Sequence, residues 1–490
     1  MLATSPLGLG VLAFPALGPL LFASTRSRSV GAAAASGLAC GWVFLAGGFL
    51  WMPWNLGGRL WAVWILGAPL LALPIAAFAA LVRTLARVRG ARTALCAAPA
   101  LWAALEVGRS LGPFGVTWLR LGDALAPWPA WIQLAAAGGV ELVSAWAAAS
   151  GAALAHAAAT GRRSAWATAA AIPAVGTLFG VVSMAEIDVR AQPSVRVAAV
   201  QPAIPARDRF APARFDANLG RLLALSRRAT AESPDLVAWP EGSYERAAGP
   251  TGAPFLGAVA TTLDTPVLAG MRRVAHPGSD LRWNSAVLAE PDGETRVAAD
   301  KQRPVPVYER VADGWLAGAL ARATALPGRV LVGAPAEPQT LTLRDGTQRR
   351  IGVLICIDAG FPELARDLRR AGADLLVSIA NEAESGRWTA RQHASVVRLR
   401  AVETGLPLVR VANGGPSVWI DPLGRETDRI GAGSQSHVAA LGAPRAAPPY
   451  VALGDGPVVA ALFLPGLVSA VGARRETRAR GLWPTKGTAP

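Results

Sequence analysis

The sequence predicts a multi-pass α-helical membrane domain followed by a layered α/β domain. Three observations predict this combination. The first 185 residues are mostly long apolar segments, separated by short loops that contain arginine. About 260 residues with alternating strand and helix patterns follow, and then one more apolar run precedes a basic tail. Hydrophobic residues make up 52% of the 490 residues, which is high for a soluble enzyme and favours membrane spans.

Seven apolar segments are candidates for membrane spans, and most approach the ~20 residues that a helix needs to cross the hydrocarbon core. We expect spans at residues 7–23, 30–51, 60–82, 93–107, 130–158, 165–183 and 457–471. Trp51, Trp54 and Trp128 lie near span ends, as tryptophans do in the aromatic belts of membrane proteins. The opening residues lack a positively charged region, so we expect no cleaved signal peptide.

The positions of the arginines predict the orientation in the membrane. The loops after the first, third and fifth spans are the more basic ones, with Arg26 and Arg28, Arg83 to Arg92, and Arg162 and Arg163. The positive-inside rule places these loops in the cytoplasm, so the chain after the sixth span lies outside. We therefore expect a transmembrane domain at 1–189, an outer domain at 190–450, and a last span with a cytoplasmic tail at 451–490. Basic loops also explain the net charge of +15 better than a nucleic-acid-binding stripe, so no nucleic-acid partner is expected.

The outer domain has the pattern of a layered α/β fold. Strands are predicted at 195–200, 236–239, 267–271, 285–288, 351–355, 375–379 and 408–411. Helices are predicted near 214–231, 361–371 and 387–404. Strands that alternate with helices over this length are typical of one layered α/β domain.

Three strands of this domain end close to a reactive polar side chain. Glu241 follows the strand at 236–239, Lys301 follows Asp300, and Cys356 ends the apolar strand 351–355. A cysteine between a buried strand and a helix lies where α/β folds present reactive groups. A carboxylate can act as base for a thiol if burial raises its pKa, and an ammonium can stabilise the oxyanion of acyl transfer. Taken singly, each residue also fits a simpler interpretation: a surface turn for Glu241, a solvated loop for Lys301 and core packing for Cys356.

Composition makes Lys301 the more unusual of these residues. Among 48 basic residues only Lys301 and Lys486 are lysines, so a bare need for positive charge does not explain Lys301. The histidines show neither metal-ligand spacing nor a local nucleophile motif; they are His156, His276, His393 and His437. No phosphate-binding loop or serine elbow is present either, and we expect no metal and no cofactor.

The order Trp239-Pro240-Glu241, then Lys301, then Cys356 resembles the nitrilase superfamily. The placement of these residues between membrane spans resembles the bacterial apolipoprotein N-acyltransferase family. Further stretches agree with it: Val200-Gln201-Pro202, Trp283-Asn284-Ser285, Glu309, and residues 112–114, 132–135, 361–366, 398–405, 411–415 and 421–424.

This resemblance implies an αββα sandwich and an acyltransferase of the bacterial inner membrane whose catalytic domain faces the periplasm. It implies a phospholipid as acyl donor, a thioester on the cysteine, and the N-terminal α-amine of a diacylglyceryl-modified apolipoprotein as acceptor. Matched by motif, Cys356 is the nucleophile, Glu241 the general base, Lys301 the oxyanion stabiliser and Glu309 a supporting acid. Such lipid substrates also give a reason for the membrane spans.

The sequence departs from the family pattern at two places, and two other functions are open. Ile357 and Asp358 stand where the family usually has an aromatic residue and then Glu, and residues 382–385 lack a common aromatic pair. The family also commonly has one more N-terminal span. The alternatives are a membrane-tethered amidase that releases the acyl group to water and a transporter with an outer binding module. A transporter would need ionisable groups inside the spans, where Glu106 and Glu141 are the acidic residues.

Overall fold

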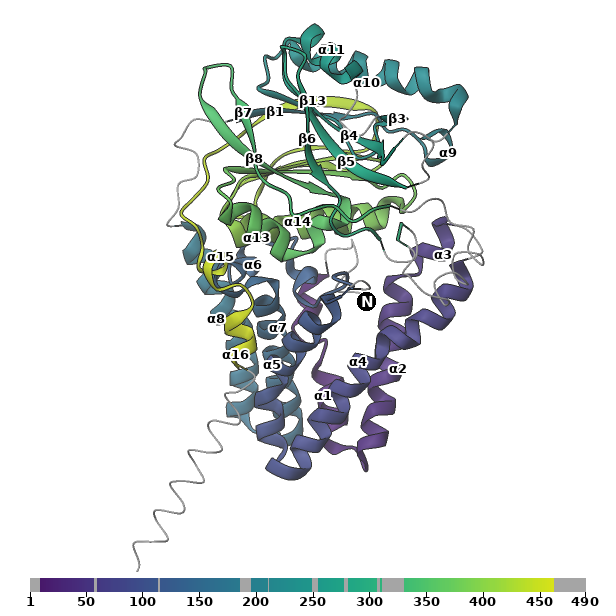
Figure 1. The fold of residues 1–490 in the computed structure, drawn as a ribbon. Helices are drawn as coiled ribbons and strands as arrows, with labels where there is room; N and C mark the ends of the chain where they lie inside the picture. Colours follow the sequence, from purple (N-terminus) through teal and green to yellow (C-terminus); the bar gives the residue numbers. More distant parts are fainter. Residues whose placement is uncertain are drawn as a thin grey trace, which may run out of the picture.

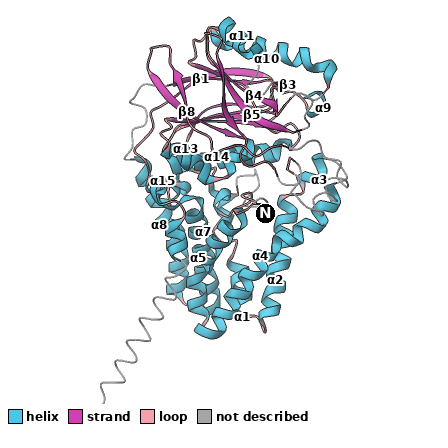
Figure 2. Cartoon of the chain, in the orientation of Figure 1, coloured by secondary structure: helices cyan, strands magenta, loops and turns pink. Residues whose placement is uncertain are grey.

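A computed structural model describes most of the chain, with an α/β domain standing on a bundle of helices (Figure 1). The described residues are 9–56, 60–112, 115–185, 195–209, 211–248, 254–276, 281–305, 309–310 and 330–461. Strands occur in the upper part and long helices in the lower part (Figure 2). This arrangement confirms the fold class that the sequence predicts.

The lower part consists of the segments predicted as membrane spans. Its helices are α1 (Gly18–Arg26), α2 (Val30–Gly48), α3 (Trp51–Leu56), α4 (Leu60–Arg89), α5 (Ala91–Ser110), α6 (Pro129–Ile132), α7 (Ala135–Thr160) and α8 (Arg163–Ala185), with the short 3-10 turns η2 (Gly10–Ala13) and η3 (Gly122–Leu125). Among the described residues, four helical segments are long and apolar enough to cross a membrane: Val30–Trp54, Gly67–Arg89, Ala135–Thr160 and Arg163–Ala185.

The first and fourth predicted spans are less clear-cut in the structure. The first is a shorter apolar helix, Gly10–Arg26, and the fourth is α5, which has the length of a span but contains Arg92, Glu106 and Arg109. Leu21, Phe78, Leu125 and other apolar side chains from these helices form one continuous buried cluster. Burying apolar faces against one another therefore holds the bundle together. The seventh predicted span begins with α16 (Gly456–Ala461), and the rest of it lies outside the described residues.

The upper part contains two sheets that pack face to face. The first has the strand order β13-β1-β2-β4-β5-β6, with β3 paired to β4, and the second has the order β12-β11-β10-β9-β8-β7. The strands are β1 (Val195–Gln201), β2 (Leu236–Ala238), β3 (Tyr244–Ala248), β4 (Val267–Val274), β5 (Arg282–Ala289), β6 (Thr295–Asp300), β7 (Gln339–Thr342), β8 (Gln348–Ile355), β9 (Leu375–Asn381), β10 (Leu408–Asn413), β11 (Ser417–Ile420), β12 (Glu426–Ile430) and β13 (Gln435–Leu441). Leu236, Ile355 and Trp419 belong to the buried apolar layer between the sheets.

Helices cover the outer face of each sheet and complete an αββα sandwich. The first sheet carries α10 (Phe215–Thr230) and α11 (Pro254–Leu263), and the second carries α13 (Pro362–Arg370) and α14 (Gly386–Thr404). Smaller elements are α9 (Ala206–Arg209), η4 (Pro212–Arg214), η5 (Cys356–Gly360) and α15 (Pro449–Leu453). In Figure 1, α13 and α14 lie between the sheets and the helical bundle, so the second sheet is the one nearer the membrane domain.

The strands that the sequence analysis does not predict are edge strands or lie off the main path of a sheet. They are β3, β6, β7, β12 and β13; the exception is β11, which is also not predicted but lies between β10 and β12. An edge strand has a neighbour on one side only, and its exposed positions carry polar residues such as Thr340 and Thr342 of β7. A continuous apolar run is therefore missing, and the periodicity that identifies central strands is too weak to see.

Candidate active site

Cys356 lies at a strained turn at the end of β8. Its φ is +55°, in the left-handed region that a residue with a Cβ rarely adopts. The turn continues as η5 and leads into α13, so the thiol stands between a buried strand and a helix, as the sequence predicts. Such strain persists only where the surrounding structure enforces it, and it is typical of functional sites.

Lys301 and Glu241 come together beside this turn. Lys301 Nζ lies 3.1 Å from Glu241 Oε1 and 2.8 Å from Glu309 Oε1, and its side chain is 1% exposed. Burial alone would lower the pKa of Lys301, but the Glu241 and Glu309 carboxylates raise it well above its ordinary value. The ammonium therefore stays charged. Glu309 is held in turn, because its Oε2 accepts the backbone N–H of Val305 at 2.7 Å.

Two asparagines orient the Glu241 carboxylate. Asn284 Nδ2 donates to Glu241 Oε1 at 2.6 Å, and the backbone N–H of Asn381 donates to Oε2 at 3.0 Å. Burial would raise the pKa of Glu241, but Lys301, with help from Arg209 and Asn284, holds it below its ordinary value. The group is thus a buried, fixed and ionised carboxylate, whose pKa lies below its ordinary value and not above it as the sequence analysis expects of a base.

The electrostatics of the thiol are different from those of its neighbours. Burial, together with the negative charge of Glu241, raises the pKa of Cys356 well above its ordinary value, and Lys301 opposes this shift. Cys356 is consequently a neutral thiol at neutral pH. A base must remove its proton before it can attack, and the nearby Glu241 carboxylate is ionised and has room to accept a proton.

A second polar cluster, which the sequence analysis does not predict, supports the backbone of Cys356. His393 Nε2 lies 3.1 Å from the Cys356 carbonyl oxygen, and Nδ1 lies 2.8 Å from Glu382 Oε1. Both ring nitrogens face acceptors, so both contacts are satisfied together when the imidazole is doubly protonated. Arg410 also contacts Glu382, and although burial would raise the pKa of Glu382, Arg410 and His393 keep it below its ordinary value.

This cluster explains part of the difference from the family pattern at residues 382–385. Glu382 is 3% exposed, and its Oε1 contacts both His393 and Arg410. The ring of Trp118, from the membrane domain, lies 5.4 Å from the ring of His393. No local sequence signal could identify His393, because the cysteine that it contacts is 37 positions away.

Asp358, the other departure, connects the cysteine turn to the lysine loop. Its two carboxylate oxygens accept the backbone N–H groups of Gln302 at 3.1 Å and Arg303 at 2.8 Å. Burial raises the pKa of Asp358 to about 7, although Lys301 and the two backbone donors favour its charged form. The shorter acidic residue therefore still joins the segment that carries Cys356 to the one that carries Lys301.

Several residues that carry the family resemblance brace the scaffold instead of lining this site. Trp239 is fully buried and its Nε1 donates to Ser226 Oγ at 2.9 Å. Gln201 Oε1 accepts from Ser417 Oγ at 2.9 Å, which joins β1 to β11. Within the described part of the chain, no group of three or more His, Cys, Asp or Glu residues is arranged to hold a metal ion.

Comparison with known proteins matches both parts of the chain to families. Residues 1–153 match the apolipoprotein N-acyltransferase N-terminal domain, and residues 196–438 match the carbon-nitrogen hydrolase domain. The apolipoprotein N-acyltransferase of Bordetella bronchiseptica is 30% identical over 428 residues, which cover 80% of this chain and 76% of that protein. This chain belongs to the apolipoprotein N-acyltransferase family.

Other relatives in the apolipoprotein N-acyltransferase family align over a smaller part of the chain. The protein of Geobacter metallireducens is 35% identical over 234 residues, which are 47% of this chain and 44% of that protein. The chain thus aligns with about half the length of this relative, and with 51% of the Rhizobium meliloti protein. Among solved structures, a carbon-nitrogen hydrolase from Helicobacter pylori is 19% identical with a TM-score of 0.36, covering 51% of this chain and 89% of that one.

Proposed function

We propose that this protein moves an acyl chain from a phospholipid to the N-terminal α-amine of a diacylglyceryl-modified apolipoprotein, through a thioester on Cys356. The observation that supports this most directly is the buried Lys301–Glu241 pair next to a neutral thiol at a strained turn, in a chain of this family. No separate base, metal or cofactor is needed for the two acyl transfers.

The proposed first half-reaction consumes the phospholipid ester. Glu241 accepts the proton of the Cys356 thiol, and the sulfur attacks the ester carbonyl while Lys301 stabilises the oxyanion. The C–O bond of the ester then breaks. The leaving lysophospholipid alkoxide takes the proton back from Glu241, and the acyl chain remains on sulfur as a thioester.

The proposed second half-reaction is the reverse process with an amine. The α-amine of the acceptor attacks the thioester carbonyl, Lys301 again stabilises the oxyanion, and the C–S bond breaks. The amine loses a proton as the amide forms and the Cys356 thiolate regains one, with Glu241 as the carrier. Glu309 supports both steps, because it holds the Lys301 ammonium together with Glu241.

The arrangement of domains supports a reaction at a membrane surface. The helix that carries His393, α14, packs on α7 and η3 of the helical bundle, and Trp118 of that bundle reaches the His393 ring. An acyl chain can stay in apolar surroundings while its carbonyl reaches the thiol. In this proposal, 1–189 and 451–490 are the membrane parts, and 190–450 is the catalytic domain on the periplasmic side of the inner membrane.

The test is a two-stage mass measurement on the purified full chain. With phospholipid alone, intact mass should increase by one acyl chain, and hydroxylamine should remove it. Adding a diacylglyceryl lipopeptide should then transfer the chain to the peptide amine. The Cys356→Ala variant should show no adduct, whereas a Cys40→Ala/Cys96→Ala double variant, which lacks two exposed cysteines, should behave like the wild type.

Two outcomes would contradict the proposal. An adduct that persists in Cys356→Ala would mean that another residue is the nucleophile. Release of free fatty acid without any acylated lipopeptide would favour the membrane-tethered amidase.

A further inference from the structure

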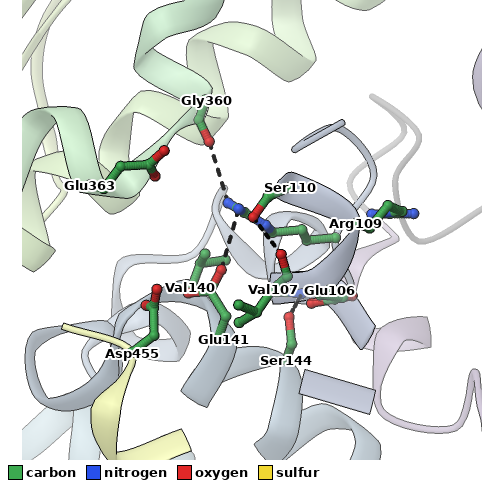
Figure 3. A network of polar contacts seen from close by, with 12 residues as sticks. Glu106, Val107, Arg109, Ser110, Val140, Glu141, Ser144, Gly360, Glu363 and Asp455 are labelled. Atoms are coloured by element: carbon green, nitrogen blue, oxygen red, sulfur yellow. Dashed lines mark hydrogen bonds and ion pairs between the residues drawn. The ribbon is translucent and has the colours of Figure 1, made fainter. Parts of the chain in front are cut away.

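Two arginines from different domains meet at the last residue of the cysteine turn. Arg120 Nη1 donates to the Gly360 carbonyl oxygen at 3.3 Å, and Arg400 Nη1 donates to the same oxygen at 3.3 Å. Arg120 lies in the membrane domain before η3, Arg400 lies on α14, and Gly360 ends η5, which begins with Cys356. Figure 3 shows the surroundings of Gly360 and Glu141 in this network.

Each arginine is paired with its own carboxylate. Arg120 Nη2 lies 3.3 Å from Glu141 Oε1, and Arg400 Nη2 donates to Glu403 Oε1 at 2.8 Å. The four side chains, which we call the four-charge cluster, are between 0% and 2% exposed and are therefore shielded from water. In such surroundings an unpaired charge is costly, and the charge pairs fix the guanidinium positions.

The cluster ties the two domains together in both directions. Arg120 of the membrane domain holds a carbonyl of the catalytic domain, and Glu403 of the catalytic domain accepts the backbone N–H of Val140 at 2.9 Å. Val140 follows a break in α7, where Gly138 and Gly139 leave the helical conformation. The interrupted helix leaves this N–H without its usual partner, and Glu403 supplies one.

The segment that carries Arg120 is itself fixed to the bundle. Glu106 of α5 accepts the backbone N–H of Leu121 at 2.7 Å, and Ser144 of α7 accepts that of Gly122 at 2.8 Å. These contacts hold the backbone next to Arg120 in a fixed position; Glu106 and Ser144 are drawn in Figure 3. There is also little free space at the turn, because a Cβ on Gly360 would lie 2.7 Å from Thr117 Oγ1.

We infer that the four-charge cluster positions the cysteine turn on the membrane domain, and that Arg120 is a positioning residue for Cys356. The inference rests on the proposed function for its effect on catalysis. The attachment of the cysteine turn to Arg120, which we call the clamp, is a structural property that can be measured separately. Arg120 touches neither the thiol nor the Lys301–Glu241 pair in the described contacts; it acts through the backbone of η5.

The decisive variant removes both partners of one pair. Arg120→Met alone strands the Glu141 charge and should lower the melting temperature strongly. Arg120→Met/Glu141→Leu removes both charges, and replacing a buried ion pair with apolar residues of similar size is often neutral for stability. The double variant should regain the wild-type melting temperature but still lack the Arg120 donor to Gly360, so that only the Arg400 donor remains.

Two measurements on the full chain in detergent distinguish whether Arg120 positions the cysteine turn or only neutralises the charge of Glu141. In the double variant, backbone amides of residues 358–361, 363 and 364 should exchange with deuterium at least ~10-fold faster than in the wild type, while those of β9 should not change. Acyl loading of Cys356 from phospholipid should be slower by a factor of ~10², the usual consequence of a misplacement of about 1 Å.

Arg398→Met is the matched control. Arg398 also bridges the domains, since its Nη1 donates to the Pro127 carbonyl oxygen at 2.8 Å, but it does not reach the cysteine turn. This variant should keep both wild-type exchange in the turn and wild-type acyl loading. If the double variant does not fold, Arg120→Lys replaces it, because lysine keeps the charge near Glu141 but lacks the guanidinium fork that serves both partners.

Wild-type exchange of the turn in the stable variant, or in Arg120→Lys, would overturn the clamp and leave the cluster as a charge pair only. If the wild type itself takes up no acyl chain, the proposed function fails, but the exchange measurement still decides whether the clamp exists.

Discussion

At the scale of single residues, Lys301 combines an unusual amino acid choice with an unusual environment. Its Nζ lies between two carboxylates, and the side chain is almost fully buried in a chain that uses arginine nearly everywhere else. A compact ammonium fits there, while a guanidinium is larger and has a fixed donor geometry. The site therefore requires lysine itself and not only a positive charge.

We predict that Lys301→Arg inactivates the enzyme without unfolding it. Losing one oxyanion contact typically lowers the rate by a factor of ~10²–10³, and the charge that balances Glu241 and Glu309 is kept. Turnover and thermal unfolding should be measured on the same preparation. Arg303→Lys, two residues further on, is the control, because Arg303 makes a partly exposed ion pair with Glu363. Near-normal turnover of Lys301→Arg would remove Lys301 from the mechanism.

Asp358 gives the activity a predicted dependence on pH. Its pKa is raised to about 7 by burial, so it loses its charge as the pH falls through about 7. The protonated form turns one oxygen into a donor, and one of the two backbone contacts with Gln302 and Arg303 is then lost. We therefore expect kcat/KM to decrease on the acidic side of about pH 7.

The Asp358→Asn variant tests this assignment. Its amide offers one acceptor oxygen, so turnover at pH 8 should decrease roughly 10-fold, by the value of one hydrogen bond to a charged group. The decrease near pH 7 should disappear from the rate profile. A profile with the same midpoint in Asp358→Asn would assign that ionisation to another group.

At the scale of elements, the position of Glu241 depends on a close approach of two backbone segments. A Cβ on Gly270 of β4 would lie 2.5 Å from Glu241 Cα and 2.6 Å from the Pro240 carbonyl oxygen. These are backbone atoms, so no side-chain rotation could relieve the contact. Glycine at position 270 allows the turn that carries Glu241 to pack closely against the backbone of β4.

We predict that Gly270→Ala lowers activity by displacing Glu241. A shift of even a few tenths of an ångström changes the contacts with Lys301 and Asn284, and we expect a loss of roughly 10–10² in turnover. Gly220→Ala is the matched control: it lies in α10, has no atom within 4 Å of its added Cβ, and should stabilise the protein by about 0.5–1 kcal/mol. Wild-type kinetics of Gly270→Ala would mean that the backbone adapts.

At the scale of the whole molecule, the arginines of the loops predict how the protein lies in the membrane. Arg26, Arg89 and Arg163 lie at the ends of α1, α4 and the start of α8. In Figure 1 the α/β domain stands at one end of the helical bundle, and α1 lies toward the other end. This is the arrangement expected if the basic loops at one end of the bundle lie in the cytoplasm and the α/β domain at the other end lies outside the membrane.

We predict that reporter fusions at Arg26, Arg89 and Arg163 report the cytoplasm, and that one near Gly249 reports the periplasm. Alkaline phosphatase and a fluorescent protein, which are active on opposite sides, should give complementary results at every position. A cytoplasmic result near Gly249 would contradict the proposed substrates, because it would place the thiol on the other side from the proposed acceptor.

The sequence by itself determined the features that have local signals. A strand buried on both faces is a continuous apolar run, so 351–355 and 375–379 could be predicted, and with them the place of Cys356. Long apolar helices are equally local, because the hydrocarbon core imposes a minimum length. Lys301 stands out in the sequence because lysine is so rare in this chain. The family motifs then assigned Glu241 and Glu309 to the same candidate site as Lys301.

Only the tertiary structure decided which distant polar groups meet. His393 reaches the carbonyl of Cys356, and Arg120 reaches that of Gly360 across 240 positions of the sequence. Arginine, histidine and glutamate on a helix look like solvated residues in a sequence, because their partners are backbone atoms without a residue-specific signature. Their burial becomes favourable only when packing of the two domains supplies those acceptors and opposite charges at the same point, and that is a property of the folded molecule.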